Sequence, residues 1–574
     1  GVRCAESCSC PHKCLLRNTP LLNTPFSCDQ PTTGLGFTFS TPYLYNGIGF
    51  AGVPDFVNCA EQSDITESCS NLKICLLDNT THLEPIIELF SRVHILAVPT
   101  LGASHEAFIN GDCNTLVGEQ IEIAEAALRS AGYTGEYAVG TNIFSNEPLG
   151  IVTRDDDARF SDFVNWILRG LLAAEEQGVT QATASTFTKS RVFGAGFENM
   201  FVDAVADVGN YGEIYARHLE SLVPRKPMDM INDGTTGLIY SFPFGNIGRE
   251  NIFRTGPRPS TGGTLEEIIE RDHLVCGVTS RPGFAEFDSA TETWSGLDID
   301  YCRALSASVF SCVVAETVVY KDLSAEEGFI ALARKEIDVL SSHTHINMVT
   351  DVFDADAMTG FSFSLPIFYD GLGFRGLPQY VQCADELNTT SPECQDMCIC
   401  VDVSTTSGVA SRLFEIFPDE PCILAKASDE SAWQAIADGD CQVVAESRVT
   451  SGSGQSWGNS MEGEYELGVK RFTKEPLALV TRQDDPRWTS FVFWIVSATF
   501  HAEEEGISKG SSNEMPTTDL FPTSDDRTLR NAIQIVGSYQ EIYERNLGRT
   551  VPRGGMNLLN SNPFGPQHYP LPGF

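Results

Sequence analysis

The stretch Phe37-Thr-Phe-Ser-Thr-Pro42-Tyr-Leu-Tyr45-Asn-Gly47-Ile-Gly-Phe50 occurs again, with few changes, as Phe361-Ser-Phe-Ser-Leu-Pro366-Ile-Phe-Tyr369-Asp-Gly371-Leu-Gly-Phe374. A second matching pair lies further along the chain: Val208-Gly-Asn-Tyr211-Gly-Glu-Ile-Tyr215 and Val536-Gly-Ser-Tyr539-Gln-Glu-Ile-Tyr543. The offset between the copies drifts only from 324 to 328 residues, so the copies are collinear. A repeat of this kind has to be recognised before a fold is assigned.

The two copies are unequal. Ahead of the shared part, the second copy has Leu265 to about Asp354, and the first copy has almost no equivalent. We therefore predict one and a half domains rather than two. The predicted parts are a Cys-rich segment (1–14), an incomplete first copy (15–245), a Pro/Gly-rich linker (246–263) and a complete second copy (264–574).

Composition limits the classes of function. The 574 residues carry a net charge of −39, which argues against nucleic-acid binding because phosphate contacts need clustered Lys and Arg. We expect a solvated acidic surface, typical of a soluble secreted protein, that binds divalent cations at most weakly. The sequence has no apolar run long enough to span a membrane and no recognisable signal peptide, and its start at Gly1 is expected to be processed or truncated.

The cysteines predict an oxidising compartment. There are 18, and four positions recur in both copies. Recurrence at matched positions favours structural disulfides. The connectivity cannot be read from the sequence, but we expect the pairs Cys59–Cys69, Cys75–Cys113, Cys383–Cys394 and Cys400–Cys441, with Cys276–Cys302 as a fifth. The sequons at Asn79 and Asn388 predict N-linked glycans and agree with a secreted, extracellular location.

Apolar strands alternate with helical segments through the second copy. Leu274 to Val278 and Ile337 to Leu340 are typical of buried strands, and Trp488 to Glu505 has the spacing of a long amphipathic helix, which the first copy matches at Phe160 to Glu176. This alternation predicts an α/β fold with largely parallel sheets.

Six stretches of the second copy carry a family resemblance: Cys276-Gly-Val, Pro282-Gly-Phe, Trp294-Ser-Gly-Leu-Asp-Ile-Asp300-Tyr-Cys302, Tyr369-Asp-Gly371, Lys474-Glu475-Pro476-Leu477 and Asn546-Leu-Gly. In these stretches the second copy resembles the type 2 periplasmic solute-binding proteins, and in particular the general L-amino-acid-binding proteins of ABC importers. The first copy matches from Arg17 onward, for example at Glu147-Pro148-Leu149. The resemblance implies tandem two-lobe domains with a ligand cleft between the lobes. In the second copy it implies lobe 1 at about 265–368 and 480–565, and lobe 2 at about 373–475. The first copy would lack the opening half of its lobe 1.

The resemblance also implies a ligand site, and here the sequence departs from the family. The family arginine that grips an α-carboxylate falls on Thr350 in the second copy, within His343-Thr-His-Ile-Asn347-Met-Val-Thr350-Asp351, and on Pro25 in the first. The acidic residue that holds the α-ammonium falls on Ser447, next to Glu446, and on Glu119 in the first copy. Loss of the arginine alone is expected to cost about 2–5 kcal/mol of binding free energy. Asn347, Thr350, Asp351, Glu446 and Glu119 remain the candidate ligand contacts.

Other constellations carry little chemistry. His343-x-His345 has the spacing of a weak metal pair, the Asp155–Asp157 run is expected to cap a helix, and Cys4, Cys8, Cys10 and Cys14 are expected in disulfides rather than in a metal knuckle. We expect no catalysis, no cofactor and no metal.

Two functions follow from these observations. The first is a secreted, glycosylated structural subunit that reuses the binding fold and assembles head-to-tail with other copies into a filament or matrix, because an incomplete domain exposes sheet edge and apolar surface. The alternative is an extracellular binding protein for an amino acid or another small polar solute, held by the complete second copy. The sequence also allows this chain to be part of a longer array.

Overall fold

The computed structural model describes residues 37–62, 69–78, 93–142, 147–223, 263–311, 317–352, 360–402, 422–426, 429–447, 465–468, 475–518 and 526–548, with single positions between these ranges and up to residue 557. The four N-terminal cysteines, Pro25, Asn79 and the linker 246–262 lie outside the described residues. No helix in the described part combines the length and apolar character needed to cross a membrane.

Lobe 1 of the second copy is built on the sheet β13-β10-β14-β22-β15, with β16 also paired to β22. Its first strand, β10, reads Leu-Val-Cys-Gly-Val and is buried throughout, as expected for a parallel strand covered on both faces. The strands are β10 (Leu274–Val278), β13 (Val318–Asp322), β14 (Val339–His345), β15 (Phe361–Phe363), β16 (Phe368–Asp370) and β22 (Glu475–Arg482). β13 and β14 are parallel to β10, whereas β22 is antiparallel to β14.

Helices pack on this sheet around one large apolar core. They are α8 (Thr264–Arg271), α9 (Leu297–Phe310), α10 (Ala325–Ala333), α11 (Met348–Asp351), α16 (Pro486–Glu504), α17 (Thr528–Val536) and α18 (Tyr539–Asn546). Buried Asp300 of α9 accepts hydrogen bonds from Arg545 (2.7 Å) and Asn546 (2.6 Å) of α18. Two of the family-like stretches therefore meet in one polar contact. A hairpin of β11 (Glu286–Asp288) and β12 (Thr293–Ser295) precedes α9.

Lobe 2 is the part that both copies share in full. In the second copy its strand order is β19-β18-β20-β17-β21, and in the first it is β5-β4-β6-β3-β7. The second-copy elements are β17 (Leu372–Gly376), α12 (Pro378–Asp385), β18 (Cys398–Asp402), β19 (Cys422–Lys426), α14 (Asp429–Ala437), β20 (Val443–Ser447) and β21 (Glu466–Leu467). The first-copy elements are β3 (Ile48–Gly52), α1 (Pro54–Gln62), β4 (Lys73–Leu77), β5 (His94–Val98), α3 (Leu101–Asn110), β6 (Thr115–Glu119), α4 (Glu125–Ser130) and β7 (Ala138–Val139). The repeat is thus one of topology as well as of sequence.

The rest of the first copy is half of a lobe 1, which we call the first-copy half-lobe. It consists of the strand pairs β1 (Phe37–Phe39) with β9 (Val152–Arg154) and β2 (Leu44–Asn46) with β8 (Glu147–Leu149), and the helices α5 (Ala158–Glu176), α6 (Met200–Val208) and α7 (Tyr211–His218). Asp157 is the N-cap of α5 and accepts a hydrogen bond from the Phe160 amide, so this part of the acidic run caps a helix. Among the described residues, nothing in the first copy corresponds to β13, β10 and β14.

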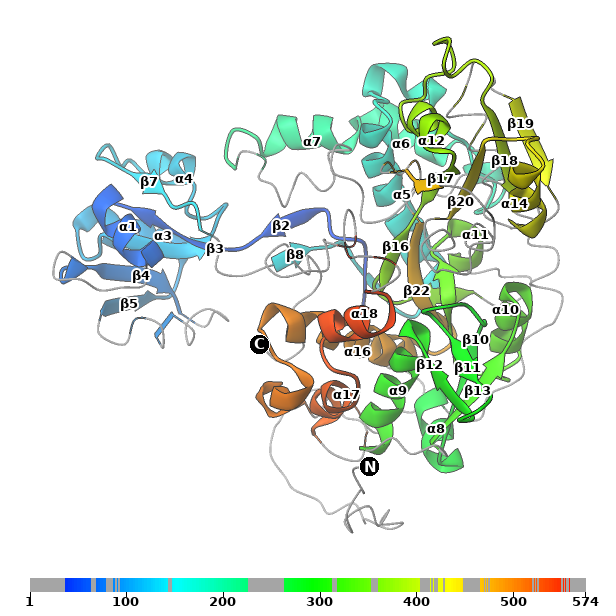
Figure 1. Ribbon diagram of the computed structural model, residues 1–574. Coiled ribbons are helices and arrows are strands. Elements are labelled where there is room, and N and C mark those ends of the chain that lie inside the picture. The colour runs from blue at the N-terminus through cyan, green and yellow to red at the C-terminus, as the bar shows by residue number, and fades with distance from the viewer. Residues whose placement is uncertain are drawn as a thin grey trace.

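The first-copy half-lobe packs against the second copy. Its core includes Met348 and Val352, which come from α11 and the residue that follows it. Figure 1 shows the contrast with first-copy lobe 2 (α1, α3, α4 and β3–β7), which lies well apart at the end of β2 and β8. The two halves of the first copy therefore have different neighbours.

Disulfides link each of the five pairs expected from the sequence. A sixth, Cys398–Cys422, joins neighbouring strands β18 and β19 and was not expected. It has no counterpart in the first copy, where the same ladder position holds Lys73 and His94. The Cys398–Cys422 pair could therefore not be predicted from cysteines that recur in both copies.

Candidate ligand site at the lobe boundary of the second copy

The two lobes of the second copy join where β16 of one sheet continues into β17 of the other through Gly371. Ligands of α/β sheets bind beyond the carboxyl ends of the strands. In lobe 1 these ends carry the loop after β10, with Arg281, and the end of β14, with His343 and His345. In lobe 2 the end of β20 carries Ser447.

Arg281 spans the boundary between the lobes. A tight turn holds its backbone: Arg281 and Ala285 exchange two hydrogen bonds of 2.8 Å, and Gly283 between them has a φ of +77°. That turn aims the guanidinium at lobe 2, where Nη2 lies 3.4 Å from Oγ of Ser447. The turn formed by Pro282-Gly-Phe thus positions the Arg281 guanidinium at the boundary between the lobes.

Asp370 completes this contact from the hinge. Its carboxylate is buried, accepts a 2.8 Å hydrogen bond from the Gly371 amide on Oδ1, and accepts another from the Ser447 hydroxyl on Oδ2. The Ser447 hydroxyl of lobe 2 therefore contacts both the Arg281 guanidinium of lobe 1 and the Asp370 carboxylate of the hinge.

Two histidines at the end of β14 border this group. Nδ1 of His343 lies 3.5 Å from Oδ2 of Asp298, which is fully buried in α9. Burial lowers the pKa of His343 and the nearby Arg281 lowers it further, whereas Asp298 opposes the shift. His343 therefore stays neutral near pH 7. Nδ1 of His345 faces Glu475, 3.3 Å away.

No protein-family model matches the chain. Individual proteins do. A putative amino-acid ABC transporter-binding protein of Escherichia coli, YhdW, is 30% identical over 326 residues, which is 52% of this chain and 90% of that protein. The general L-amino acid-binding periplasmic protein AapJ of Rhizobium johnstonii is 31% identical over 342 residues, 54% of this chain and 92% of that protein. The chain belongs to the periplasmic amino-acid-binding proteins of ABC transporters.

A solved structure of the same kind is an ABC transporter periplasmic binding protein from Brucella ovis with glutathione bound. It is 28% identical, covers 51% of this chain and 92% of that one, and superposes with a TM-score of 0.40. Family membership fixes the fold as two-lobe α/β. The matches to these relatives cover about half of the chain, which is the length of one complete copy.

The family position of the carboxylate-binding arginine lies at the start of α11. Thr350 stands there, is buried, and donates from Oγ1 to the Asn347 carbonyl, while Asn347 caps the same helix by accepting from the Thr350 amide. Asp351, the next residue, accepts a 2.7 Å hydrogen bond from Nε1 of Trp166 in the first copy. These three residues are engaged in the helix turn and in the contact between copies.

The two acidic candidates lie in lobe 2. Glu446 is buried and accepts a 3.2 Å hydrogen bond from Nε1 of Trp433 in α14. Glu119 and Ser447 occupy the same ladder position: Glu119 is opposite Ile48, and Ser447 is opposite Leu372. The alignment of Ser447 with Glu119 therefore agrees with the registers of the two sheets.

Metal ligands do not gather at this boundary. His343 and His345 each face a single carboxylate, and the described residues contain no group of three or more His, Cys, Asp or Glu side chains placed to hold a metal ion.

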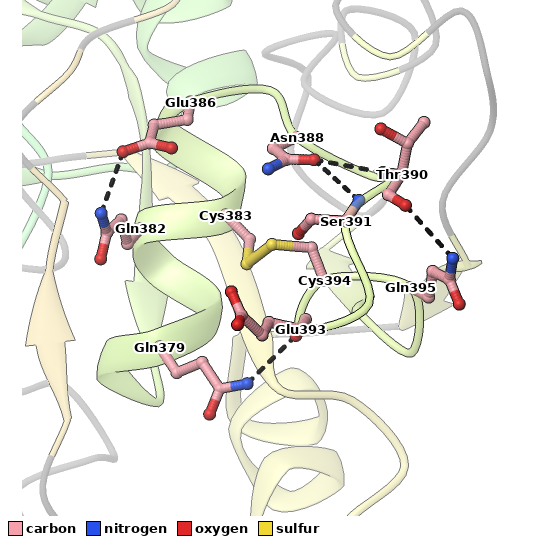
Figure 2. Close-up of a disulfide and its surroundings, with 10 residues drawn as sticks. All are labelled: Gln379, Gln382, Cys383, Glu386, Asn388, Thr390, Ser391, Glu393, Cys394 and Gln395. Carbon is pink, nitrogen blue, oxygen red and sulfur yellow. Dashed lines mark hydrogen bonds between the residues drawn. A yellow bond between two sulfur atoms is a disulfide. The ribbon is translucent and has the colours of Figure 1, made fainter.

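Asn388, the predicted glycan site within the described part of the chain, lies in the loop closed by Cys383–Cys394 (Figure 2). Its Oδ1 accepts hydrogen bonds from the amides of Thr390 (3.2 Å) and Ser391 (3.1 Å), and the side chain is only partly buried. Figure 2 shows the amide nitrogen, which would carry a glycan, turned away from these bonds. Glycosylation stays a prediction.

Sequence reasoning missed Arg281 and Asp370 as site residues. Asp370 lies inside a family-like stretch, between Tyr369 and Gly371, and Arg281 lies directly before another, at Pro282. The available signal was a charged residue at the end of a buried strand, as Asp370 is in β16, or in the loop that follows one, as Arg281 is after β10. Ligands of α/β sheets bind beyond these strand ends.

Proposed function

We propose that the second copy is a solute-binding module that takes an amino acid, or another small polar solute with a carboxylate, at its lobe boundary. The observation that carries this proposal is the meeting of Arg281, Asp370 and Ser447 from lobe 1, hinge and lobe 2. A ligand at this point would contact both lobes and would therefore stabilise their closed arrangement.

The chemistry of the three side chains supports this choice of ligand. A guanidinium is well suited to a carboxylate because its planar fork donates two parallel, charge-assisted hydrogen bonds. The Asp370 carboxylate is suited to an ammonium group. Arg281 would thus do from the loop after β10 what the family arginine does from the start of α11, where this chain has Thr350.

The relatives favour this function over a structural one. Both curated relatives are named as binding proteins, and neither name refers to a filament or a matrix. They are periplasmic or importer-linked proteins, which supports a location outside the cytoplasm, as do six disulfides. We assign binding to the second copy because the first copy shows no opening half of lobe 1 in its described residues.

Ligand-dependent thermal stability tests the proposal. The wild-type chain is screened with the standard amino acids and with glutathione, and hits are measured by calorimetry. Saturation at 100 times Kd should add about 2.7 kcal/mol to the free energy of unfolding. Arg281→Met keeps the length of the side chain but removes the charge, and should weaken binding by at least about 2 kcal/mol.

The matched control is Arg334→Met, which removes another lobe 1 arginine that is half exposed and lies 4.0 Å from Glu336. It should leave affinity unchanged. If no compound shifts the melting temperature, or if Arg281→Met binds as well as wild type, the proposed site is wrong.

A further inference from the structure

A histidine and a carboxylate meet inside lobe 1 of the second copy without forming a hydrogen bond. Nδ1 of His343 lies 3.5 Å from Oδ2 of Asp298, and both atoms are buried. Among the residues that the structure describes, neither atom has a hydrogen-bond partner. Buried polar atoms are normally paired, so this contact needs an explanation. One proton supplies it, because a protonated Nδ1 donates a charge-assisted hydrogen bond to a carboxylate.

An irregularity in β14 places His343 beside this carboxylate. The register of β14 against β22 shifts between Leu340 and Thr344, and His343 within that stretch has a φ of +42°. Bulged strand segments redirect side chains, and a left-handed φ is uncommon for a residue with a Cβ atom. Ser341 from the same stretch donates to Oδ1 of Asp298 (3.3 Å). The irregular segment therefore presents a hydroxyl to one carboxylate oxygen and an imidazole to the other.

The turn that positions Arg281 is attached to the same two residues. The Asp298 amide donates to the carbonyl of Phe284 (3.0 Å), which lies in the turn between Arg281 and Ala285. The Phe284 ring packs edge-on against the His343 ring, with 5.6 Å between the ring centroids. Burial lowers the pKa of His343, and the Arg281 charge lowers it further. The histidine at the end of β14 and the cation at the lobe boundary therefore affect each other.

Three charged or titratable side chains act on His343. Asp298 in α9 favours its protonation, whereas Arg281 in the loop after β10 and His345 in β14 oppose it. The His343 side chain is only 15% exposed, so water and salt screen these charges little. A carboxylate bound to Arg281 would offset one of the two opposing charges. Protonation of His343 therefore depends on whether Arg281 holds an anion.

We propose that His343 and Asp298 form a proton site coupled to Arg281, so that a carboxylate ligand and a proton bind together. The inference rests on the proposed function, in which Arg281 binds the carboxylate. In the free chain the guanidinium disfavours a second positive charge on His343. When a ligand offsets the guanidinium, His343 takes a proton from the solvent and its Nδ1–H donates to Oδ2 of Asp298. Because the complex then holds more protons than the free chain, affinity rises as the pH falls.

The coupling is tested first in the full chain without a ligand. Histidine rings labelled with a carbon isotope at Cε1 are titrated by NMR, and the His343→Asn variant identifies the His343 signal. Arg281→Met removes the charge that a bound carboxylate would offset, and should raise the pKa of His343. The matched control is Arg334→Met, at a half-exposed lobe 1 arginine, which should leave that pKa unchanged. Identical His343 titrations in wild type and Arg281→Met overturn the proposal.

Calorimetry then measures the proton that accompanies the ligand. The probe is the amino acid that gives the largest thermal shift in the screen, titrated in two buffers of different ionisation enthalpy. Wild type should take up protons and bind at least about threefold more tightly at pH 5.5 than at pH 7.5, since one proton allows up to about tenfold per pH unit.

His343→Asn should bind without proton uptake and with equal affinity at both pH values. Asparagine suits a left-handed φ, keeps an N–H donor for Asp298 and does not titrate. The matched control is His501→Gln, which removes a histidine with a lowered pKa from the last turn of α16 and should behave as wild type.

The outcomes separate this inference from the proposed function. Wild-type binding without proton uptake overturns the coupled proton site and leaves the binding function intact. Proton uptake that persists in His343→Asn assigns the proton to another group and also overturns the site. If no amino acid binds, the proposed function fails, and the ligand-free titration of Arg281→Met decides whether His343 is coupled to Arg281.

Discussion

Asp351 is a buried carboxylate at the contact between the copies. Burial raises its pKa from 3.8 to about 6, although the Arg169 charge and the hydrogen bond from Trp166 both oppose the shift. The folded chain therefore holds a proton on Asp351 at pH values at which the unfolded chain has released it. The stabilisation from this group is fully present below about pH 4 and is lost as the pH rises through 6.

We predict that Asp351→Asn removes this pH dependence. An amide of the same shape still accepts from Trp166 but never needs to be ionised. Between pH 4.5 and pH 7, wild type should lose on the order of 2–3 kcal/mol of unfolding free energy relative to the variant. Urea unfolding at both pH values measures the difference. Asp112→Asn, an exposed position, is the control and should follow wild type; parallel profiles for wild type and Asp351→Asn would contradict the assignment.

At the scale of elements, β18 and β19 show which features the internal repeat predicts and which it does not. They match β4 and β5 in order, direction and register, so the sequence repeat extends to these strands. It does not predict that Cys398 and Cys422 face each other, because cross-strand neighbours in a parallel pair are separated by a whole connection in the chain. Arg281 and Asp370 were not predicted as site residues for a similar reason. Their contacts with Ser447 depend on how the two lobes are arranged, which a local sequence pattern does not determine.

The double variant Cys398→Ala/Cys422→Ala should destabilise lobe 2 of the second copy. The bridge closes a segment with a sequence separation of 24 residues, and loops of that size are worth about 3 kcal/mol through the unfolded state. Hydrogen exchange of the β18 amides, followed by mass spectrometry, reports on this lobe separately. Under reducing conditions the variant and wild type should exchange alike. Equal protection under oxidising conditions would show that the bridge adds no stability.

At the scale of the whole molecule, the repeat and the family-like stretches predict two unequal copies of one fold, and the two lobe 2 sheets have the same strand order. What they do not predict is that α5 of the first copy packs on α11 of the second. Trp166 and Asp351 lie 185 positions apart, and Gln483 donates to both Asp162 and the Asp351 carbonyl. No pattern within either copy encodes such a contact, because Trp494, the repeat counterpart of Trp166, packs against Phe493 instead.

The contact predicts that the first-copy half-lobe and the second copy unfold together, and Trp166→Phe tests this. Phenylalanine keeps the packing but leaves the buried Asp351 without its donor, which should cost about 1–3 kcal/mol. The control is the repeat counterpart Trp494→Phe, a half-buried ring that packs edge-on against Phe493. By calorimetry, Trp166→Phe should separate an early transition from the main one, and Trp494→Phe should not. If Trp166→Phe melts in one transition at the same temperature as Trp494→Phe, the hydrogen bond from Trp166 to Asp351 contributes little to the coupling between the two copies.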